Sequence, residues 1–133
     1  MIDELQPQAV IFSDGGPGCR WVGNENGFAG ATNWSFLRAG EVYPGYPKYR
    51  ELQYGHADGN QWVAAECDVS IRPGWFYHPE EDDRVKTADA LTDLYYRSVG
   101  HNATLLLNFP VDRDGLIHPC LLYTSDAADD LIG

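Results

Sequence analysis

The sequence lacks three features that would each indicate a particular class of protein. No run of residues approaches the ~18 apolar side chains of a membrane-spanning helix, and no charged-then-apolar signal segment follows Met1. The three cysteines, Cys19, Cys67 and Cys120, have no metal-type spacing and cannot all pair within one chain. Basic residues are also scarce, since 9 lysines and arginines stand against 20 acidic residues. The resulting net charge of -11 disfavours nucleic acid and anionic membrane surfaces as partners, so we expect a neutral ligand.

What the sequence does contain is the composition of one globular domain, with 44% hydrophobic and 22% charged residues in 133. Its aromatic residues are 4 Trp, 8 Tyr and 5 Phe, and many lie beside Gly or Pro, as in "NWSF", "EVYPGYPKY" and "RPGWFYHP". Rings on turns are often exposed, and their flat faces suit the C–H faces of sugars. The same rings could instead pack under long loops, and the pattern alone leaves both interpretations open.

Three apolar segments are predicted to be strands. The run "AVIF" at 9–12 is bounded by Pro7 and by "SDGGPG", which is typical of a buried strand ending in a turn. The segment "QWVAAECDVSI" at 61–71 predicts a second buried strand. The nearly continuous apolar run "ATLLLN" at 103–108 predicts a strand covered on both faces.

One helix and one long connection complete the predicted pattern. "TADALTDLYYRSVGHN" has helical spacing of its apolar residues, with Thr87 as the N-cap and Gly100 at the C-terminal end. The stretch 15–61 is rich in Gly, Pro, Asn and Tyr, and only "KYREL" within it indicates a helical turn. The order of strand, long loop, strand, loop, helix and strand predicts an α/β fold with a parallel sheet.

In parallel sheets and barrels the functional residues lie on loops after the carboxyl ends of the strands. In this sequence those loops hold Asp14, Glu25, Trp75, Tyr77, His78, Asn108 and Asp112. Glu25 lies in "GCRWVGNENGFAG", a glycine-rich loop with aromatic neighbours. Apolar walls raise the pKa of a carboxyl group, as an acid catalyst requires, although most loop glutamates are simply hydrated.

Two long motifs resemble a known family. "QAVIFSDGGPGCRWVGNENG" and "AECDVSIRPGWFYHPEEDDRVKTADALTDLYYRSVGHNATLLLNFPVDRDGLIHP", in that order, resemble the second half of the catalytic barrel of α-L-fucosidases of glycoside hydrolase family 29. The resemblance covers nearly everything up to Pro119. It implies a (β/α)8 barrel of the TIM type, truncated on its N-terminal side, and a retaining exo-hydrolase that releases terminal α-L-fucose from fucosylated oligosaccharides.

The resemblance also implies roles for particular residues. The "RWVGNE" loop resembles the branch that prefers α-1,3- or α-1,4-linked fucose, in which this Glu is the general acid/base, so Glu25 takes that role. Trp75 corresponds to the aromatic residue beside the fucose methyl group, and Trp21, Arg20 and His78 are further substrate-binding candidates. Glu66 and Asp68 are weaker candidates that could be satisfied within the barrel interior. No metal or other cofactor is expected, since hydrolysis of this kind needs none.

A retaining glycosidase needs a second carboxylate, and we expect it to lie upstream of this chain on an earlier barrel strand. The chain by itself is therefore expected to be inactive. Residues 120–133, beginning "CLLYTSDAADD", resemble the read-through translation of a sequencing adapter, and we expect them to be a non-native tail following a barrel portion at 1–119. A natural Ala/Asp tail is the alternative for these residues. For the whole protein, the alternative function is a non-catalytic carbohydrate-binding module that uses the same aromatic loops.

Overall fold

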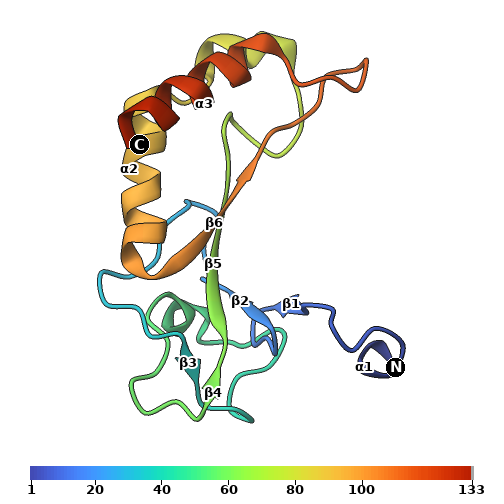
Figure 1. The fold of residues 1–133 in the computed structure, drawn as a ribbon, viewed down its shortest axis with the longest axis vertical. Coiled ribbons are helices and arrows are strands. Elements are labelled where there is room, and N and C mark those ends of the chain that lie inside the picture. Colours follow the sequence, from blue (N-terminus) through green and yellow to red (C-terminus); the bar gives the residue numbers. More distant parts are fainter. Residues whose placement is uncertain (133) are drawn as a thin grey trace.

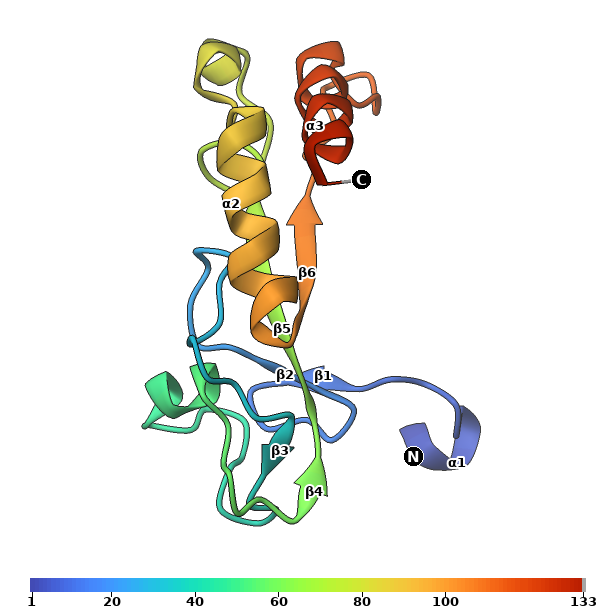
Figure 2. The same ribbon diagram turned by 60° about the vertical axis from the view of Figure 1, so that its left-hand side comes forward.

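A computed structural model describes residues 1–132 and contains a four-stranded parallel sheet (Figures 1 and 2). In spatial order its strands are β1 (Phe12–Ser13), β2 (Cys19–Trp21), β5 (Ala64–Ser70) and β6 (Ala103–Asn108). Every neighbouring pair is parallel, and β5 pairs with β6 along six residues. The predicted α/β class and parallel sheet are confirmed. Strand β2, which the sequence did not indicate, lies between β1 and β5.

Helices cover one face of this sheet. Helix α2 (Ala88–Ser98) connects β5 to β6, and helix α3 (Pro119–Ile132) follows β6; the two lie side by side against the strands (Figure 2). A short helix, α1 (Ile2–Leu5), lies apart at the N-terminus (Figure 1). The core between the helices and the sheet is built from Val69, Ile71, Leu91, Leu94, Leu121 and Ala128. Residues of the expected non-native tail therefore form a helix whose Leu121 is fully buried.

The boundaries of α2 follow from its end residues. Thr87 is the N-cap, as predicted, and its side chain accepts a hydrogen bond from the Ala90 amide. The C-terminal end differs from the prediction, because the chain continues past Gly100 in the 3-10 turn η3 (Val99–His101). The left-handed residue that ends the turn is Asn102, with φ of 59°. Asparagine tolerates this conformation better than most residues, which explains how it replaces the expected glycine.

The opposite face of the sheet is open, and this corrects two predictions. The segment 9–12 contributes only Phe12 to a strand, and Val10 is 75% exposed instead of buried. Strand β6 alternates, because Leu105 and Leu107 pack towards the helices while Leu106 is 52% exposed on the other face. Within the part of the chain that the structure describes, no element covers these residues. The apolar run of β6 was therefore wrongly interpreted as covered on both faces.

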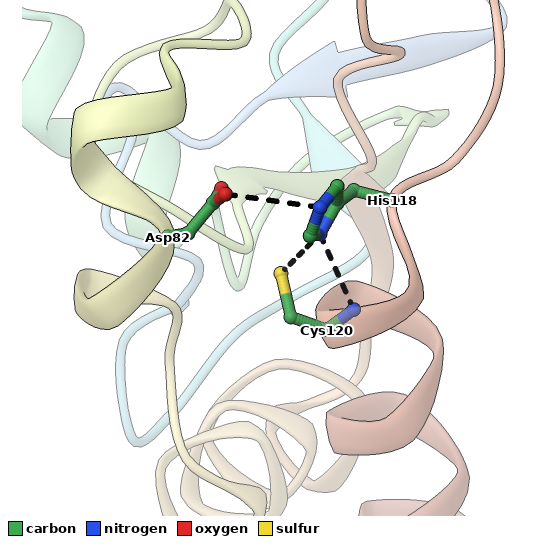
Figure 3. A group of neighbouring side chains, drawn as sticks. All are labelled: Asp82, His118 and Cys120. Carbon is green, nitrogen blue, oxygen red and sulfur yellow. Dashed lines mark hydrogen bonds and ion pairs between the residues drawn. The ribbon is translucent and has the colours of Figure 1, made fainter.

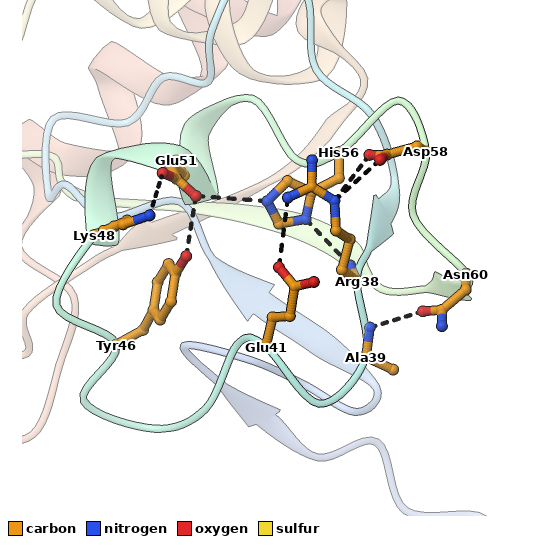
Figure 4. Close-up of polar contacts among 9 residues, drawn as sticks. All are labelled: Arg38, Ala39, Glu41, Tyr46, Lys48, Glu51, His56, Asp58 and Asn60. Atoms are coloured by element: carbon orange, nitrogen blue, oxygen red, sulfur yellow. Dashed lines mark hydrogen bonds and ion pairs between the residues drawn. The ribbon is translucent and has the colours of Figure 1, made fainter.

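The connection from β2 to β5 forms a small lobe of its own. It contains the 3-10 helix η1 (Tyr49–Gln53), which confirms the predicted helical turn, and an antiparallel pair, β3 (Phe36–Leu37) with β4 (Gln61–Trp62). The predicted strand 61–71 is therefore split, since its first two residues pair with β3 instead of continuing β5. Polar contacts centred on His56 join the lobe's loops: its Nδ1 accepts the Arg38 amide, and its Nε2 lies 3.6 Å from Glu51 (Figure 4).

Arg20, in the middle of β2, fastens this lobe to the sheet. Its side chain is fully buried, and its guanidinium donates hydrogen bonds of 2.6–3.0 Å to four acceptors: the carbonyls of Leu52, Val63 and Trp34 and the side-chain oxygen of Asn33. Burial lowers the pKa of Arg20 to about 10. All four acceptors are neutral oxygens, so Arg20 forms no ion pair. Its N–H groups instead donate hydrogen bonds to three separate segments of the lobe.

Replacing Arg20 with Met is therefore expected to lower the free energy of unfolding by about 3 kcal/mol or more, since each buried acceptor left without a donor costs about 1–3 kcal/mol. Urea denaturation of the two purified chains measures this change. Arg38→Met is the matched control, because Arg38 is 42% exposed and bonds Asp58 and Glu41 at the surface. Its loss is expected to cost less than about 1 kcal/mol. Equal losses for the two variants would contradict the role assigned to Arg20.

The 3-10 helix η2 (Pro79–Arg84) lies between β5 and α2 and completes the secondary structure.

The three cysteines are unpaired, and Cys19 and Cys67 are buried. Among residues 1–132, no helix is both long enough and apolar enough to cross a membrane.

Candidate active site

Glu25 and Trp75 meet at the carboxyl ends of the parallel strands. Glu25 lies four residues after β2, and Trp75 lies five residues after β5. The indole Nε1–H of Trp75 donates a hydrogen bond of 3.1 Å to Oε2 of Glu25. The structure thus brings together two of the residues that the sequence analysis placed on loops after strand ends. The contact joins loops that are 50 residues apart in the chain.

The turn around Glu25 is fixed by its neighbours. The side-chain oxygen of Asn24 accepts the amide of Asn26, while its NH₂ group donates to the carbonyl of Phe28, so Asn24 brackets the glutamate. Gly27 has φ of 78°, and a β-carbon there would lie 2.7 Å from Val69 and 2.9 Å from Leu94. Only glycine fits a loop that passes this close to the core. The sequence therefore holds Glu25 above the end of the sheet by packing as well as by hydrogen bonds.

A hollow of about 210 Å³ lies between these two loops. Its wall consists of Glu25, Val69, Ser70, Arg72, Pro73, Gly74, Trp75 and Lys86. Two of these residues, Arg72 and Lys86, are basic and were not among the predicted site residues, because nothing within the long second motif distinguishes them. The Lys86 ammonium donates to the Ser70 carbonyl at 2.7 Å, and burial lowers its pKa. The hollow thus combines Glu25, Trp75 and Lys86, while the guanidinium of Arg72 is buried and bonds the His78 carbonyl and Asp82.

A second hollow, of about 260 Å³, lies on the other side of Trp75. It is lined by Trp75, Phe76, Tyr77, Asn108, Phe109, Pro110 and Val111, so its wall is mostly aromatic and apolar. Phe76 is 77% exposed at its mouth. Trp75 is the one residue that lines both hollows. Trp75 therefore lies between the space next to Glu25 and the aromatic space.

Trp21 forms a second indole–carboxylate pair on the open face of the sheet. Its Nε1–H donates to Oδ1 of Asp68 at 2.7 Å, across the parallel pair of β2 and β5. Burial raises the pKa of Asp68, and the charge of Glu25 acts in the same direction, while the hydrogen bond from Trp21 opposes them. Glu66, on the same face, lies 3.8 Å from the sulfur of Cys19. Trp21 and Asp68 are neighbours of the Glu25 site, although neither lines the hollow beside Glu25.

Two predicted substrate contacts do not fit this geometry. Arg20 is fully buried, and its guanidinium is occupied on the helix-covered side, away from the hollow. Its substrate-binding assignment is wrong, because alternation along β2 sends Arg20 and Trp21 to opposite faces. His78 is exposed, with its Nδ1 3.9 Å from Glu80, and it does not line the hollow beside Glu25. His78 is connected to the wall of the hollow through its backbone carbonyl, which accepts a hydrogen bond from Arg72.

Asp82, His118 and Cys120 form a cluster next to Arg72 and Tyr77, although their spacing in the sequence indicated no metal centre (Figure 3). His118 lies between the other two, with Nδ1 3.0 Å from the Cys120 sulfur and Nε2 3.8 Å from Asp82. The carboxylate of Asp82 already bonds the guanidinium of Arg72 at 2.9 Å. The imidazole contacts its two neighbours through opposite nitrogens, so the cluster ties the segment before α3 to η2.

Comparison with known proteins identifies relatives of this chain. No protein-family model matches it. Alpha-L-fucosidase 1 of Arabidopsis thaliana is 50% identical over 122 residues, which is 88% of this chain and 23% of the plant enzyme. The chain thus spans less than a quarter of the length of the curated relatives it matches.

Solved structures agree with the sequence comparison. A glycoside hydrolase 29 family member from an unknown rumen bacterium superimposes with a TM-score of 0.88 at 47% identity, over 99% of this chain and 24% of that one. A Ruminococcus gnavus GH29 fucosidase in complex with fucose superimposes with a TM-score of 0.70 at 34% identity, over 85% of this chain and 23% of that one. The chain is therefore a homologue of glycoside hydrolase family 29 α-L-fucosidases over about a quarter of their length, and its parallel sheet matches part of their catalytic domain.

Proposed function

We propose that this chain supplies the general acid/base and part of the sugar pocket of a retaining exo-α-L-fucosidase acting on fucosylated oligosaccharides. The observation that carries the proposal is the contact between Glu25 and Trp75 at the carboxyl ends of the strands. It brings a proton-donating group and an aromatic ring to one small hollow, as a monosaccharide site requires. The crystallised relative with bound fucose supports the same substrate class.

The hydrogen bond from Trp75 defines how Glu25 would act. An indole N–H can only donate, so the oxygen that it contacts, Oε2, serves as an acceptor. The transferable proton then resides on Oε1. In the first step this proton passes to the glycosidic oxygen, while a carboxylate outside this chain attacks the anomeric carbon and forms a covalent glycosyl–enzyme intermediate. In the second step the Glu25 carboxylate takes a proton from the water that releases fucose.

The remaining parts of the assignment follow from the same arrangement. Trp75 provides the apolar face against the methyl group of fucose, and Trp21, held by Asp68, borders the site from β2. The preferred linkages are α-1,3 and α-1,4, as the "RWVGNE" loop suggests. Residues 1–119 form the barrel portion and 120–133 the non-native tail, while the nucleophile comes from preceding strands of the whole protein. No metal takes part in the steps assigned to these residues.

A segment exchange tests the proposed function. The segment of Arabidopsis thaliana α-L-fucosidase 1 that aligns with this chain is replaced by the corresponding residues of this chain, which are 50% identical. This chimera is expected to release aglycone from an aryl α-L-fucoside within about tenfold of the plant enzyme. A folded chimera that binds L-fucose without hydrolysing the fucoside would support the carbohydrate-binding alternative. A folded chimera that neither binds nor hydrolyses would overturn both.

A further inference from the structure

Asn108, the last residue of β6, holds both ends of the loop that carries Trp75. Its Nδ2 donates to the Ser70 hydroxyl at 3.2 Å and to the Trp75 carbonyl at 3.1 Å. Its own backbone carbonyl accepts the amide of Ile71 at 3.1 Å. Three hydrogen bonds from one residue thus span the start and the end of the segment from Ser70 to Trp75.

The loop between these anchor points has little else to fix its far end. Arg72 anchors the beginning, because its buried guanidinium bonds the His78 carbonyl and Asp82. Gly74, directly before Trp75, has φ of 65° and no atom within contact distance of a β-carbon built there. The backbone at Trp75 is therefore determined mainly by the amide of Asn108, which reaches across from the neighbouring strand.

The position of Trp75 in turn decides what Glu25 contacts. The indole donates to Glu25 on one side and separates the two hollows on the other. A shift of the Trp75 backbone would break the hydrogen bond to Glu25. It would also join the hollow beside Glu25 to the aromatic hollow. A displacement of about 1 Å at such a site is enough to cost on the order of 10²-fold in rate.

We propose that Asn108 is a positioning residue that acts through Trp75: its side-chain amide fixes the indole so that it orients Glu25 and separates the two hollows. The catalytic meaning of this role rests on the function proposed above, but the placement of Trp75 does not. Asparagine suits the task because one planar NH₂ group can donate to both Ser70 and Trp75. Aspartate has the same shape but no N–H, so it would set a carboxylate against the Trp75 carbonyl.

The test uses the indole N–H resonances of the full 133-residue chain at pH 7, since its four tryptophans give four such signals. Glu25→Gln is expected to shift the Trp75 signal, because a neutral amide replaces the carboxylate acceptor. In an Asn108→Ala background the same Glu25→Gln change is expected to leave the Trp75 signal nearly unmoved. Asn108→Asp is a second background of unchanged shape and is expected to behave in the same way.

The Trp21 signal provides the matched control within the same molecule. Asp68→Asn is expected to shift it equally in the presence and absence of the Asn108 amide, because Trp21 bonds Asp68 independently of Trp75. Ser70→Ala removes one partner of Asn108 and leaves the Trp75 carbonyl bonded, so the coupling of Trp75 to Glu25 should persist. A Trp75 signal that still responds to Glu25→Gln in both Asn108 backgrounds overturns the proposal. Loss of the native Trp21 signal in both backgrounds also overturns it, because Asn108 would then support the whole fold.

Titration of the unmodified chain with L-fucose separates this proposal from the proposed function. A shift of the Trp75 signal on adding fucose supports the sugar assignment, and loss of the coupling between Trp75 and Glu25 in the Asn108 variants supports the positioning role. If fucose moves no indole signal while the Asn108 variants uncouple Trp75 from Glu25, the sugar assignment fails and the positioning role stands. If fucose shifts Trp75 and the Asn108 variants leave its coupling to Glu25 intact, the positioning role fails alone.

Discussion

The isolated 133-residue chain is expected to hydrolyse an aryl α-L-fucoside at least about 10⁴-fold more slowly than the chimera. A retaining mechanism needs two carboxyl groups about 5–5.5 Å apart, and the proposed function places only the acid/base on this chain. Loss of one member of a catalytic unit commonly lowers the rate by about 10⁴- to 10⁶-fold.

The measurement is release of the chromogenic aglycone by equal concentrations of the purified chain and the chimera. Circular dichroism and the indole signals of the chain show whether it is folded under the assay conditions. Hydrolysis by the folded chain at a rate near that of the chimera would place the nucleophile within residues 1–132. Asp14, which follows β1 and accepts the amide of Gly45, would then be the first residue to replace.

The parts of the fold that were predicted correctly are those with a long periodic pattern. Helix α2 has apolar residues at helical spacing and a threonine N-cap, and β5 and β6 are long enough to show their apolar character. Strand β2 has three residues with a buried arginine in the middle, so no apolar pattern marks it. It forms because β5 offers a parallel partner and the lobe supplies acceptors for Arg20, and both are tertiary effects.

In the candidate site, too, some contacts could be predicted from the sequence and others depend on the tertiary structure. The convergence of Glu25 and Trp75 was predictable, because loops after neighbouring parallel strands share one edge of the sheet. The predicted substrate contact of Arg20 is wrong, because a residue close to Glu25 in the sequence need not lie close to it in space. Its strand was not recognised, so the alternation that directs Arg20 away from Trp21 could not be applied. The sequence places Asn108 at the end of a strand but does not reveal what its side-chain amide contacts, because Trp75 and Ser70 lie 33 and 38 residues away.

Glu25→Gln in the chimera is expected to lower kcat by about 10²- to 10⁴-fold on a natural fucosylated oligosaccharide, the usual contribution of general acid catalysis. Glutamine has nearly the same shape and can still accept the hydrogen bond from Trp75, so substrate binding should change little. The loss of kcat/KM, which reports the first step, should be smaller on an aryl fucoside, whose phenolate departs with little need of protonation. Comparing kcat/KM on the two substrates therefore separates the loss of the acid from damage to the pocket, whereas kcat also includes the second step, in which Glu25 takes a proton from water.

Glu41→Gln in the chimera is the matched control, because Glu41 is a 61% exposed carboxylate of the lobe that does not line the hollow beside Glu25. Its kcat should remain within a few fold of the unmodified chimera on both substrates. If Glu25→Gln were as active as this control on the oligosaccharide, Glu25 would have no part in proton transfer. If instead Glu25→Gln lowered kcat/KM equally on both substrates, the residue would act in substrate binding in place of leaving-group protonation, because only an acid acting on the departing oxygen discriminates between the two leaving groups.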